Sequence, residues 1–448
     1  MSELSCDVVV VGLGPGGESL AAGLAKAGLD VIGVEAELVG GECPYWGCIP
    51  SKMAIRAANL LAEARRIDGM AGSATVTPDF GVVAQRIRDE ATDNWDDAVA
   101  VKRLEDSGAR FIRGKGRIVG ERRVEVGGQR IEARKGVVLN TGTRAMIPPI
   151  DGLSDTPYWT NREALKAKAA PASLVVMGGG SIGLELAQMF SRFGTDVTVV
   201  EAGPRLLGPE EPDSSDMIAK VFTNEAIRVH VDSKVTRVGH DGTRFKVTFG
   251  GTDVSAEQLL VATGRESRID NIGLDSVGVD ARGKFVDVDE HQRVNEWLWA
   301  IGDITGKGAF THISMYQAAI AQRSILGTDG PGADYSALSR VTFTDPEIGA
   351  VGMTEKQARD AGINVRTSST GIPESSRGWL HKAGNNGFIK LVIDDDRGII
   401  VGATSAGPMG GETLSGLAMA VHARIPLESL RHAIWAYPTF WRAIESAL

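Results

Sequence analysis

Two glycine-rich segments built on one plan constrain the fold of this chain more than any other feature. Each contains an apolar strand, a tight turn, a helix of small residues and a second strand that ends in an acid. In CDVVVVGLGPGGESLAAGLAKAGLDVIGVEA the turn glycines and the acid are Gly12, Gly14, Gly17 and Glu35. In SLVVMGGGSIGLELAQMFSRFGTDVTVVEAG they are Gly178, Gly180, Gly183 and Glu201. The acid follows the first glycine by 23 residues in both segments.

The repeated Gly-x-Gly-x-x-Gly turn is typical of a dinucleotide site. The first glycine makes the tight turn, the second lets the backbone approach a pyrophosphate, and the third permits close helix packing. The helix N-terminus stabilises the anion, and the acid accepts hydrogen bonds from the ribose hydroxyls. One such turn is weak evidence, but both copies have the strand, the helix and the acid in place. The sequence therefore predicts two bound dinucleotides.

Three further strands end in glycine, as expected beside a nucleotide. VVLNTGTR (137–144) and LLVATGRES (259–267) each run from an apolar strand into Thr-Gly. LWAIGD (298–303) reaches Gly302 and Asp303 before a helix begins. These signals are weak alone, since many strands end in glycine and Asp303 could merely cap its turn.

The stretch GGECPYWGCIPSK, residues 40 to 52, holds Cys43 and Cys48, two of the three cysteines in the chain. Three cysteines are too few for a disulfide scaffold, and no histidine stands near to complete a zinc site. Residues five apart do not face one another in a helix, so a bridge needs a bent turn, which Pro44 and Gly47 could supply. Such a bridge would be strained and easily reduced, at the N-terminus of a helix expected over 51–66. The alternative is two reduced, half-buried cysteines.

Composition argues against several classes of function. The 448 residues contain no apolar run of roughly 18 residues, so membrane attachment is not expected. Lys and Arg total 48 against 57 Asp and Glu, and the net charge of -9 without a basic stripe argues against a nucleic-acid partner. The few cysteines and the lack of a secretory signal pattern favour a reducing cytoplasm.

Together these features resemble the class I pyridine nucleotide-disulfide oxidoreductases, the flavoprotein family that includes dihydrolipoamide dehydrogenase, glutathione reductase and mercuric reductase. The resemblance runs along the chain to TFTDPEIGAVGMTEKQA (342–358), which is similar to the start of the family's dimerisation domain. It implies an α/β fold with two Rossmann-like dinucleotide-binding domains and a C-terminal α+β dimerisation domain. The expected FAD-binding domain is residues 1–150 and 267–332, the NAD(P)-binding domain 151–266, and the dimerisation domain 333–448.

The resemblance also implies the cofactor sites. The first glycine-rich turn and Glu35 would hold the ADP half of FAD, Asp303 would bind the ribityl chain, and the nearby residues would be Gly116, Thr141, Gly142 and Gly302. The second turn, Glu201 and Gly264 would hold NAD(P)H. Because Glu201 stands where NADPH-specific relatives carry basic residues, NADH is expected to be preferred, although Arg205 could reach a 2′-phosphate.

In the catalytic roles that the resemblance implies, Cys43 exchanges with the substrate and Cys48 lies against the flavin. Lys52 matches a lysine near the flavin N5, and Glu185 matches the carboxylate that pairs with it. His312 matches a histidine of dihydrolipoamide dehydrogenases and is expected among the cofactor-binding residues, or it is an ordinary helix histidine.

Two other positions are assigned by the same comparison. Ser181 stands where glutathione reductase-like members carry a tyrosine that covers the nicotinamide pocket, so this pocket is expected to be open. Cys6 precedes the first strand and is expected only to pack.

The C-terminal segment AYPTFWRAIESAL departs from the family pattern. Members that reduce dithiol substrates usually carry a His–Glu pair there, and Tyr437 and Arg442 occupy the two positions here. Tyrosine side chains, with a reference pKa of about 10, do not shuttle protons near neutrality as histidine does. No cysteine follows Cys48, so mercury delivery by a C-terminal cysteine pair is not expected. Aromatic packing at a dimer interface is the other interpretation of this segment.

The resulting hypothesis is an FAD-dependent NAD(P)H oxidoreductase. Electrons would pass through a disulfide of Cys43 and Cys48 to a small-molecule acceptor, which could be a disulfide, a quinone or another electrophile. A homodimer would bring Tyr437 from the second subunit, and no metal site is expected. The alternatives are a dihydrolipoamide dehydrogenase-like disulfide reductase and a non-catalytic flavoprotein that acts as a redox sensor or partner subunit.

Overall fold

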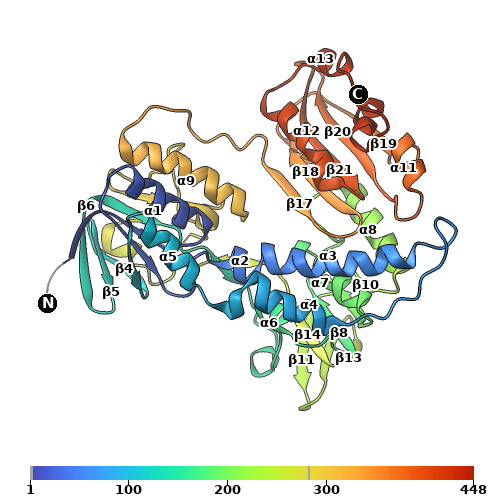
Figure 1. Ribbon diagram of the computed structural model, residues 1–448, viewed down its shortest axis with the longest axis horizontal. Helices are drawn as coiled ribbons and strands as arrows, with labels where there is room; N and C mark the ends of the chain where they lie inside the picture. Colours follow the sequence, from blue (N-terminus) through green and yellow to red (C-terminus); the bar gives the residue numbers. More distant parts are fainter. Residues whose placement is uncertain (1–3, 281–282) are drawn as a thin grey trace. The chain divides into compact units, whose positions relative to one another are not determined.

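The computed structural model describes residues 4–280 and 283–448 (Figure 1). The chain divides into two compact units. The first comprises residues 1–51, 85–146 and 264–334, and the second comprises residues 52–84, 147–263 and 335–448.

The first unit contains the first glycine-rich segment in a seven-stranded sheet. Its parallel strands are β1 (Leu4–Val11), β2 (Val31–Glu35), β3 (Arg110–Arg113), β6 (Gln129–Leu139) and β16 (Leu298–Ala300). The antiparallel strands β5 (Arg123–Val126) and β4 (Gly116–Gly120) extend it beyond β6. A separate two-stranded antiparallel sheet pairs β7 (Thr143–Ala145) with β15 (Arg265–Ser267).

Alternating apolar residues bury both faces of this sheet. Along β1, Val8 and Val10 face one core, while Val9 and Val11 face another. The core that holds Val8 and Val10 is covered by helices α1 (Pro15–Lys26), α5 (Ala98–Asp106) and α9 (Thr311–Leu326). Helices α1 and α9 pack against each other (Figure 1). The parallel strands are therefore covered by three helices on the face of Val8 and Val10.

The second glycine-rich segment forms the corresponding part of the second unit. A parallel sheet has the order β10 (Arg228–His230), β9 (Asp196–Val200), β8 (Ser173–Met177) and β14 (Gln258–Val261). Helix α7 (Ser181–Arg192) packs on β8 and β9. The antiparallel strands β11 (Val235–His240), β12 (Phe245–Phe249) and β13 (Thr252–Ala256) share a core with β8. Two further helices are α6 (Asn161–Lys166) and α8 (Pro212–Asn224).

Residues from 335 onward form an α+β part of the same unit. Its antiparallel sheet has the order β17 (Ser339–Thr342), β18 (Glu347–Gly352), β21 (Ile399–Gly407), β20 (Phe388–Asp394) and β19 (Val365–Gly371). Helix α12 (Gly410–His422) packs on β18 and β21 through Leu414, Leu417 and Val421. Three short helices are α10 (Glu355–Asp360), α11 (Ser376–His381) and α13 (Leu427–Arg431).

The cysteine stretch folds as two helices separated by one glycine. Helix α2 (Glu42–Trp46) ends at Gly47, and helix α3 begins at once and spans Cys48–Arg65. The helix expected over 51–66 thus starts three residues earlier. Helix α4 (Phe80–Arg86) follows. The expected fold class, α/β with two Rossmann-like parts and a C-terminal α+β part, is confirmed.

Candidate active site

The first glycine-rich turn closes against the end of a neighbouring strand. A Cβ on Gly12 would lie 2.3 Å from the Asn140 carbonyl oxygen, and one on Gly17 would lie 2.1 Å from the Gly12 carbonyl oxygen. Gly12 also has a φ of +93°, where a side chain would be strained. Both positions therefore require glycine.

The second turn has the same contacts. A Cβ on Gly178 would lie 2.3 Å from the Ala262 carbonyl oxygen, and one on Gly183 would lie 2.2 Å from the Gly178 carbonyl oxygen. The helices that follow have Gly14 and Gly180 as N-caps, so no side chain caps their first N–H groups. Around Gly180 nothing lies within 4 Å of an added Cβ. These features fit the approach of a pyrophosphate in both units.

The carboxylates of Glu35 and Glu201 are each held by two main-chain N–H groups. Glu35 accepts hydrogen bonds from the N–H groups of Leu13 at 2.7 Å and Glu37 at 2.8 Å. Glu201 accepts from Gly179 and Gly203, each at 2.5 Å. Two acceptor positions of each carboxylate remain for ribose hydroxyls. Burial raises the pKa of the Glu35 carboxyl above its usual value.

Arg205 is engaged near the second acid. Its guanidinium donates to the carbonyl oxygens of Leu207 and Gly208 and to the Ser215 hydroxyl. A 2′-phosphate would have to compete with these three acceptors.

Asp303 lies in a polar cluster in the first unit. Its carboxylate accepts a 2.7 Å hydrogen bond from the Thr143 hydroxyl, to which Arg265 also donates at 2.7 Å. Arg265 approaches the Glu42 carboxylate at 3.4 Å. Burial raises the pKa of the Asp303 carboxyl. Asp303 therefore does more than cap its own turn.

The remaining expected cofactor residues lie at strand ends of the first unit. Gly116 begins β4, and a Cβ there would lie 2.8 Å from Val11. The Thr141 hydroxyl donates to the Arg268 carbonyl at 2.7 Å, and Gly142 has a φ of +70°. Gly264 has a φ of +129°, and its carbonyl accepts from the Met146 N–H at 3.0 Å.

Asn140 connects these strand ends, and the sequence analysis did not predict it as a site residue. Its amide donates to the Gly12 carbonyl at 3.3 Å and accepts from the Ser314 hydroxyl at 3.2 Å. An added Cβ on Gly302 would lie 2.5 Å from its side-chain oxygen. A sequence signal for Asn140 exists in the difference between the two halves of the chain, because Ala262 occupies the equivalent position in the second half.

Cys43 and Cys48 lie close together, on α2 and at the first residue of α3. The Cys48 thiol is 3.4 Å from the hydroxyl of Thr311, the first residue of α9. The neighbouring His312 stacks on Phe310, with ring centroids 5.2 Å apart. Thr311 was not selected from the sequence, since nothing local links it to residue 48. Cys6 is fully buried, and burial raises its thiol pKa to about 12, as suits a packing role.

An aromatic stack supports the segment between the two cysteines. Tyr45 and Trp46 are buried, and the Trp46 ring stacks on Trp95 at 5.7 Å. The Trp95 indole N–H donates to the Tyr45 carbonyl at 3.2 Å. Trp95 ends a turn, with Asp93 and Asn94, in which all three residues have positive φ. Such backbone costs about 1–2 kcal/mol per residue, so the rest of the fold must hold it in place.

Lys52 and Glu185 form an ion pair in the second unit. The Lys52 ammonium is 2.8 Å from the Glu185 carboxylate, whose other oxygen accepts from the Phe343 N–H at 2.8 Å. The ammonium also lies 4.7 Å from the centre of the Phe343 ring. The Ser181 hydroxyl bonds the Thr342 hydroxyl at 2.7 Å. Phe343, too, gave no local sequence signal.

Near the C-terminus, Tyr437 is 69% exposed and Arg442 is engaged. The Arg442 guanidinium donates to the Trp435 carbonyl at 3.0 Å, pairs with Glu445 at 2.8 Å and lies 5.6 Å from the Tyr437 ring centre. Its charge is therefore partly neutralised by Glu445, three residues along the chain.

Across residues 4–280 and 283–448, no helix combines the length and apolar composition needed to cross a membrane. In these same ranges, no group of three or more His, Cys, Asp or Glu side chains is arranged to hold a metal ion.

Comparisons with known proteins agree with this arrangement. A dihydrolipoyl dehydrogenase of Zymomonas mobilis is 31% identical over 456 residues, covering 99% of this chain and 97% of the relative. A mercuric reductase of Shewanella putrefaciens is 33% identical over 453 residues, covering 98% of this chain and 80% of the relative. Among solved structures, the HOCl-induced flavoprotein disulfide reductase RclA from Escherichia coli superposes with a TM-score of 0.87 at 27% identity, covering 98% of this chain and 99% of the other.

Family models cover nearly the whole chain. Residues 6–322 match the model described as pyridine nucleotide-disulphide oxidoreductase, and residues 338–448 match the dimerisation domain of the same name. The chain therefore belongs to the pyridine nucleotide-disulphide oxidoreductase family, whose members are FAD-dependent flavoenzymes that use NAD(P)H.

Proposed function

We propose that this protein is a reductase in which Cys43 and Cys48 cycle between a disulfide and two thiols to serve a small-molecule acceptor. The observation that carries the proposal is the closeness of the two cysteines across the break between α2 and α3. Cys48 begins a long helix, where the dipole favours a thiolate. Cys43 would exchange with the acceptor, and Cys48 would lie against the flavin.

The residues around the cysteines would bind and orient the two cofactors. FAD, when bound, would supply the two-electron redox chemistry that links NAD(P)H to the disulfide of Cys43 and Cys48. In balance, NAD(P)H, one proton and the disulfide give NAD(P)⁺ and two thiols. The first glycine-rich turn and Glu35 would hold the FAD diphosphate and ribose, Asp303 would bind the ribityl hydroxyls, and the Lys52–Glu185 pair would place a cation near the flavin N5.

The cofactor-binding parts follow a three-part division in this proposal. FAD would bind residues 1–150 and 267–332, and NAD(P)H would bind residues 151–266 through the second turn, Glu201 and Gly264. NADH is the favoured donor because Glu201 would repel a 2′-phosphate and Arg205 is already engaged. Residues 333–448 would pair two subunits, consistent with the dimerisation-domain match. A reducing cytoplasm is the proposed location.

The acceptor would reach Cys43 beside Tyr437 of a second subunit. Tyr437 and Arg442 stand where a His–Glu pair serves dithiol exchange in related enzymes. We therefore favour acceptors that need little acid–base assistance, such as quinones and other electrophiles, over dihydrolipoamide-type disulfides. Because one relative was solved as a Cu(II) complex, this ion belongs among the acceptors to be tried.

The deciding experiment is an acceptor screen on the purified holoenzyme with NADH and NADPH. Quinones, disulfides and Cu(II) would be compared in the wild type and in Cys43→Ser. Sustained NADH oxidation that depends on both the acceptor and Cys43 supports the proposal. The redox sensor would instead be established if the bound flavin reduced none of the acceptors tested and the redox state of the cysteines controlled binding to another protein.

A further inference from the structure

One face of helix α7 is bonded to the segment 342–345 from the first residue of the helix to the last. The α7 residues in contact are Ser181, Glu185, Gln188 and Arg192, whose spacing of four, three and four places them on one helical stripe. Their partners on the segment run in the same order from Thr342 through Phe343 to Asp345. The segment is therefore in register with α7 at four successive points.

Gln188 and Arg192 make the contacts farthest from the Lys52–Glu185 pair. The Gln188 amide both accepts from the Asp345 N–H at 2.8 Å and donates to the Asp345 carbonyl at 2.9 Å. The Arg192 guanidinium donates to the Asp345 carboxylate at 2.8 Å and to Glu225 at 2.7 Å. Arg192 is 3% exposed, so these contacts are buried and weakly screened.

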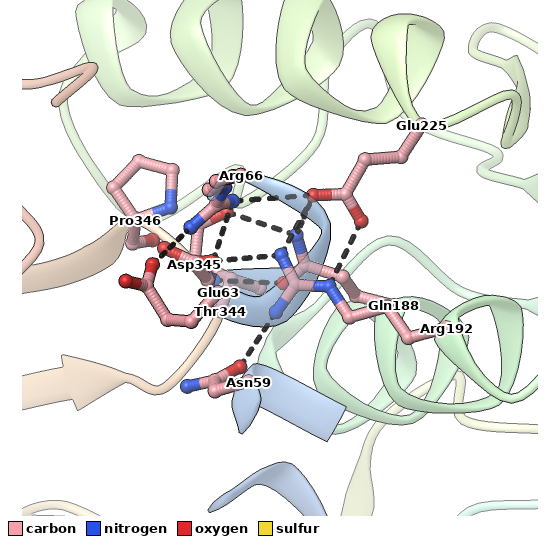
Figure 2. A network of polar contacts seen from close by, with 9 residues as sticks. All are labelled: Asn59, Glu63, Arg66, Gln188, Arg192, Glu225, Thr344, Asp345 and Pro346. Carbon is pink, nitrogen blue, oxygen red and sulfur yellow. Dashed lines mark hydrogen bonds and ion pairs between the residues drawn. The ribbon is translucent and has the colours of Figure 1, made fainter. Parts of the chain in front are cut away.

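Helix α3 joins the same network two turns beyond Lys52. Asn59, seven residues after Lys52, accepts a 2.6 Å hydrogen bond from Arg192, which is seven residues after Glu185. Arg66, seven residues further, pairs with Asp345 at 2.8 Å. Figure 2 shows Arg66, the residue after α3, and Arg192 of α7 both reaching Asp345, with Asn59 of α3 bonded to Arg192.

Two layers of contacts join α3 to α7, and the same segment binds both of them. Lys52 with Glu185 forms one layer between α3 and α7, and Asn59 with Arg192 forms the other at equal spacing on both helices. The segment binds both layers, through the Phe343 N–H and through Asp345. A pocket of about 490 Å³ is lined by residues of this network, including Arg66, Arg192 and Asp345.

We propose that Asp345 is a positioning residue for the Lys52–Glu185 pair, acting through Arg192 and Gln188 to fix the register of α3, α7 and the segment 342–345. The inference rests on the proposed function, in which that pair acts on the flavin. Asp345 itself touches neither reacting atoms nor cofactor in this scheme. Weakening its ion pairs changes the placement of the Lys52 ammonium and thereby the electrostatic field at the flavin.

The test is a double-mutant cycle on the holoenzyme with the flavin midpoint potential as the readout and the rate of flavin reduction by NADH as a second measurement. The variants are Asp345→Asn, Glu185→Gln and the double variant. Asp345→Asn keeps the main-chain bonds to Gln188 and removes the charge. We expect it to shift the potential in the direction of Glu185→Gln, to slow flavin reduction roughly tenfold, and to add little in the Glu185→Gln background.

Glu211→Gln is the matched control. Glu211 is also a buried carboxylate, but its partners are the Lys390 ammonium at 2.9 Å and the Glu355 N–H at 2.6 Å, which lie on β20 and α10 and not on α3 or α7. We expect it to lower the thermal stability without moving the potential. An equal shift of the potential in Glu211→Gln would show a general effect of destabilisation and overturn the proposal.

Two further outcomes separate the inference from the proposed function. If Asp345→Asn shifts the potential equally with and without Glu185, the residue does not act through the ion pair and the positioning role is wrong. If Lys52→Met and Glu185→Gln leave the potential unchanged, the proposed role of the pair fails first. If Asp345→Asn does not fold, Asn59→Ala replaces it as the test variant, because it removes the hydrogen bond from Arg192 and no charge. It should give a smaller shift in the same direction, and no shift would contradict the proposal.

Discussion

At the level of single residues, the two cysteines differ in their surroundings. Cys48 starts an 18-residue helix and lies 3.4 Å from the Thr311 hydroxyl, whereas Cys43 sits in the short helix α2. A helix N-terminus and a hydroxyl donor both favour the thiolate form. This asymmetry supports Cys48 as the thiolate beside the flavin and Cys43 as the exchanging thiol.

The cysteine assignment predicts opposite spectra for two serine variants. Two-electron reduction of the wild type should produce a long-wavelength absorption band from the Cys48 thiolate next to the flavin. Cys48→Ser should abolish this band, and Cys43→Ser should show it without any reductant, because Cys48 can no longer form the disulfide. Absorption spectra during anaerobic titration provide the measurement. Two titratable thiols in the oxidised protein, with no band in any state, would contradict the assignment.

Asp303 predicts a pH dependence of apoprotein stability. Burial raises its carboxyl pKa in the folded state, so the folded protein holds this proton to higher pH than the unfolded chain does. The contribution of Asp303 is therefore fully present below its ordinary value near 3.8 and is lost as pH rises through the raised value. Asp303→Asn should gain stability relative to the wild type as the pH is raised from 3.5 towards 7, as measured by denaturant unfolding. A constant difference between the two proteins across this range would refute the prediction.

Glu201 predicts the choice of nicotinamide donor. Its carboxylate is fixed by the N–H groups of Gly179 and Gly203, so it cannot easily turn away from a 2′-phosphate. The specificity constant kcat/KM should be larger for NADH than for NADPH, and Glu201→Ala should narrow the ratio roughly tenfold. Glu35→Ala, which alters the equivalent acid of the first unit, is the control and should leave the ratio unchanged. A wild-type preference for NADPH would overturn this prediction.

Among secondary-structure elements, the glycine-rich turns were predictable because all their determinants are local. Gly12 and Gly178 lie directly between a strand and a helix, and the acids end the next strand at a fixed spacing. The Lys52–Glu185 pair came from the family resemblance. Asn140, Thr311 and Phe343 were missed because their partners lie more than 100 residues away and no periodic pattern links them.

The turn between α2 and α3 predicts that Trp95 controls the redox potential of the cysteine pair. Trp95 supports the Tyr45–Trp46 segment by a ring stack and by one N–H bond. Looser support lowers the effective concentration of one thiol near the other, so the disulfide becomes easier to reduce. Trp95→Ala should shift the dithiol–disulfide equilibrium about tenfold, a rise of about 30 mV, and Trp95→Phe should give a smaller rise.

Redox titration against a glutathione buffer measures both Trp95 variants. Trp299→Phe is a suitable control, since it removes the indole N–H bond of another buried tryptophan, to Ser324, in the core of the same unit. Equal potentials in the wild type and Trp95→Ala would show that the stack serves packing alone.

At the scale of the whole molecule, the C-terminal part of the chain combines an α+β core with exposed apolar and aromatic side chains. Its sheet and helix α12 form an ordinary α+β core, while Ile434 and Tyr437 are 97% and 69% exposed. Exposed apolar side chains in a part that matches a dimerisation domain are expected to be covered by a second subunit. That Tyr437 and Arg442 replace a His–Glu pair is implied by the family resemblance and stays a prediction. The pairing of Arg442 with Glu445 was not predicted, and it leaves less positive charge for an acceptor than the residue types imply.

The last prediction concerns the class of acceptor. A positioned histidine commonly contributes roughly 10²- to 10⁴-fold to proton transfer, and neither Tyr437 nor Arg442, which pairs with Glu445, can supply this near neutral pH. The wild type should therefore reduce quinones and dyes readily and lipoamide-type disulfides poorly. Tyr437→His with Arg442→Glu should raise the ratio of lipoamide to quinone reduction at least tenfold, because the double substitution restores an acid–base pair at that position.

His312→Ala and His432→Ala test whether another histidine carries the proton. His432 pairs with Glu428, and both side chains are exposed, which makes His432 the less favourable candidate. Lipoamide turnover by the wild type as fast as quinone turnover, and insensitive to the change at Tyr437, would show that dithiol chemistry is retained without the pair.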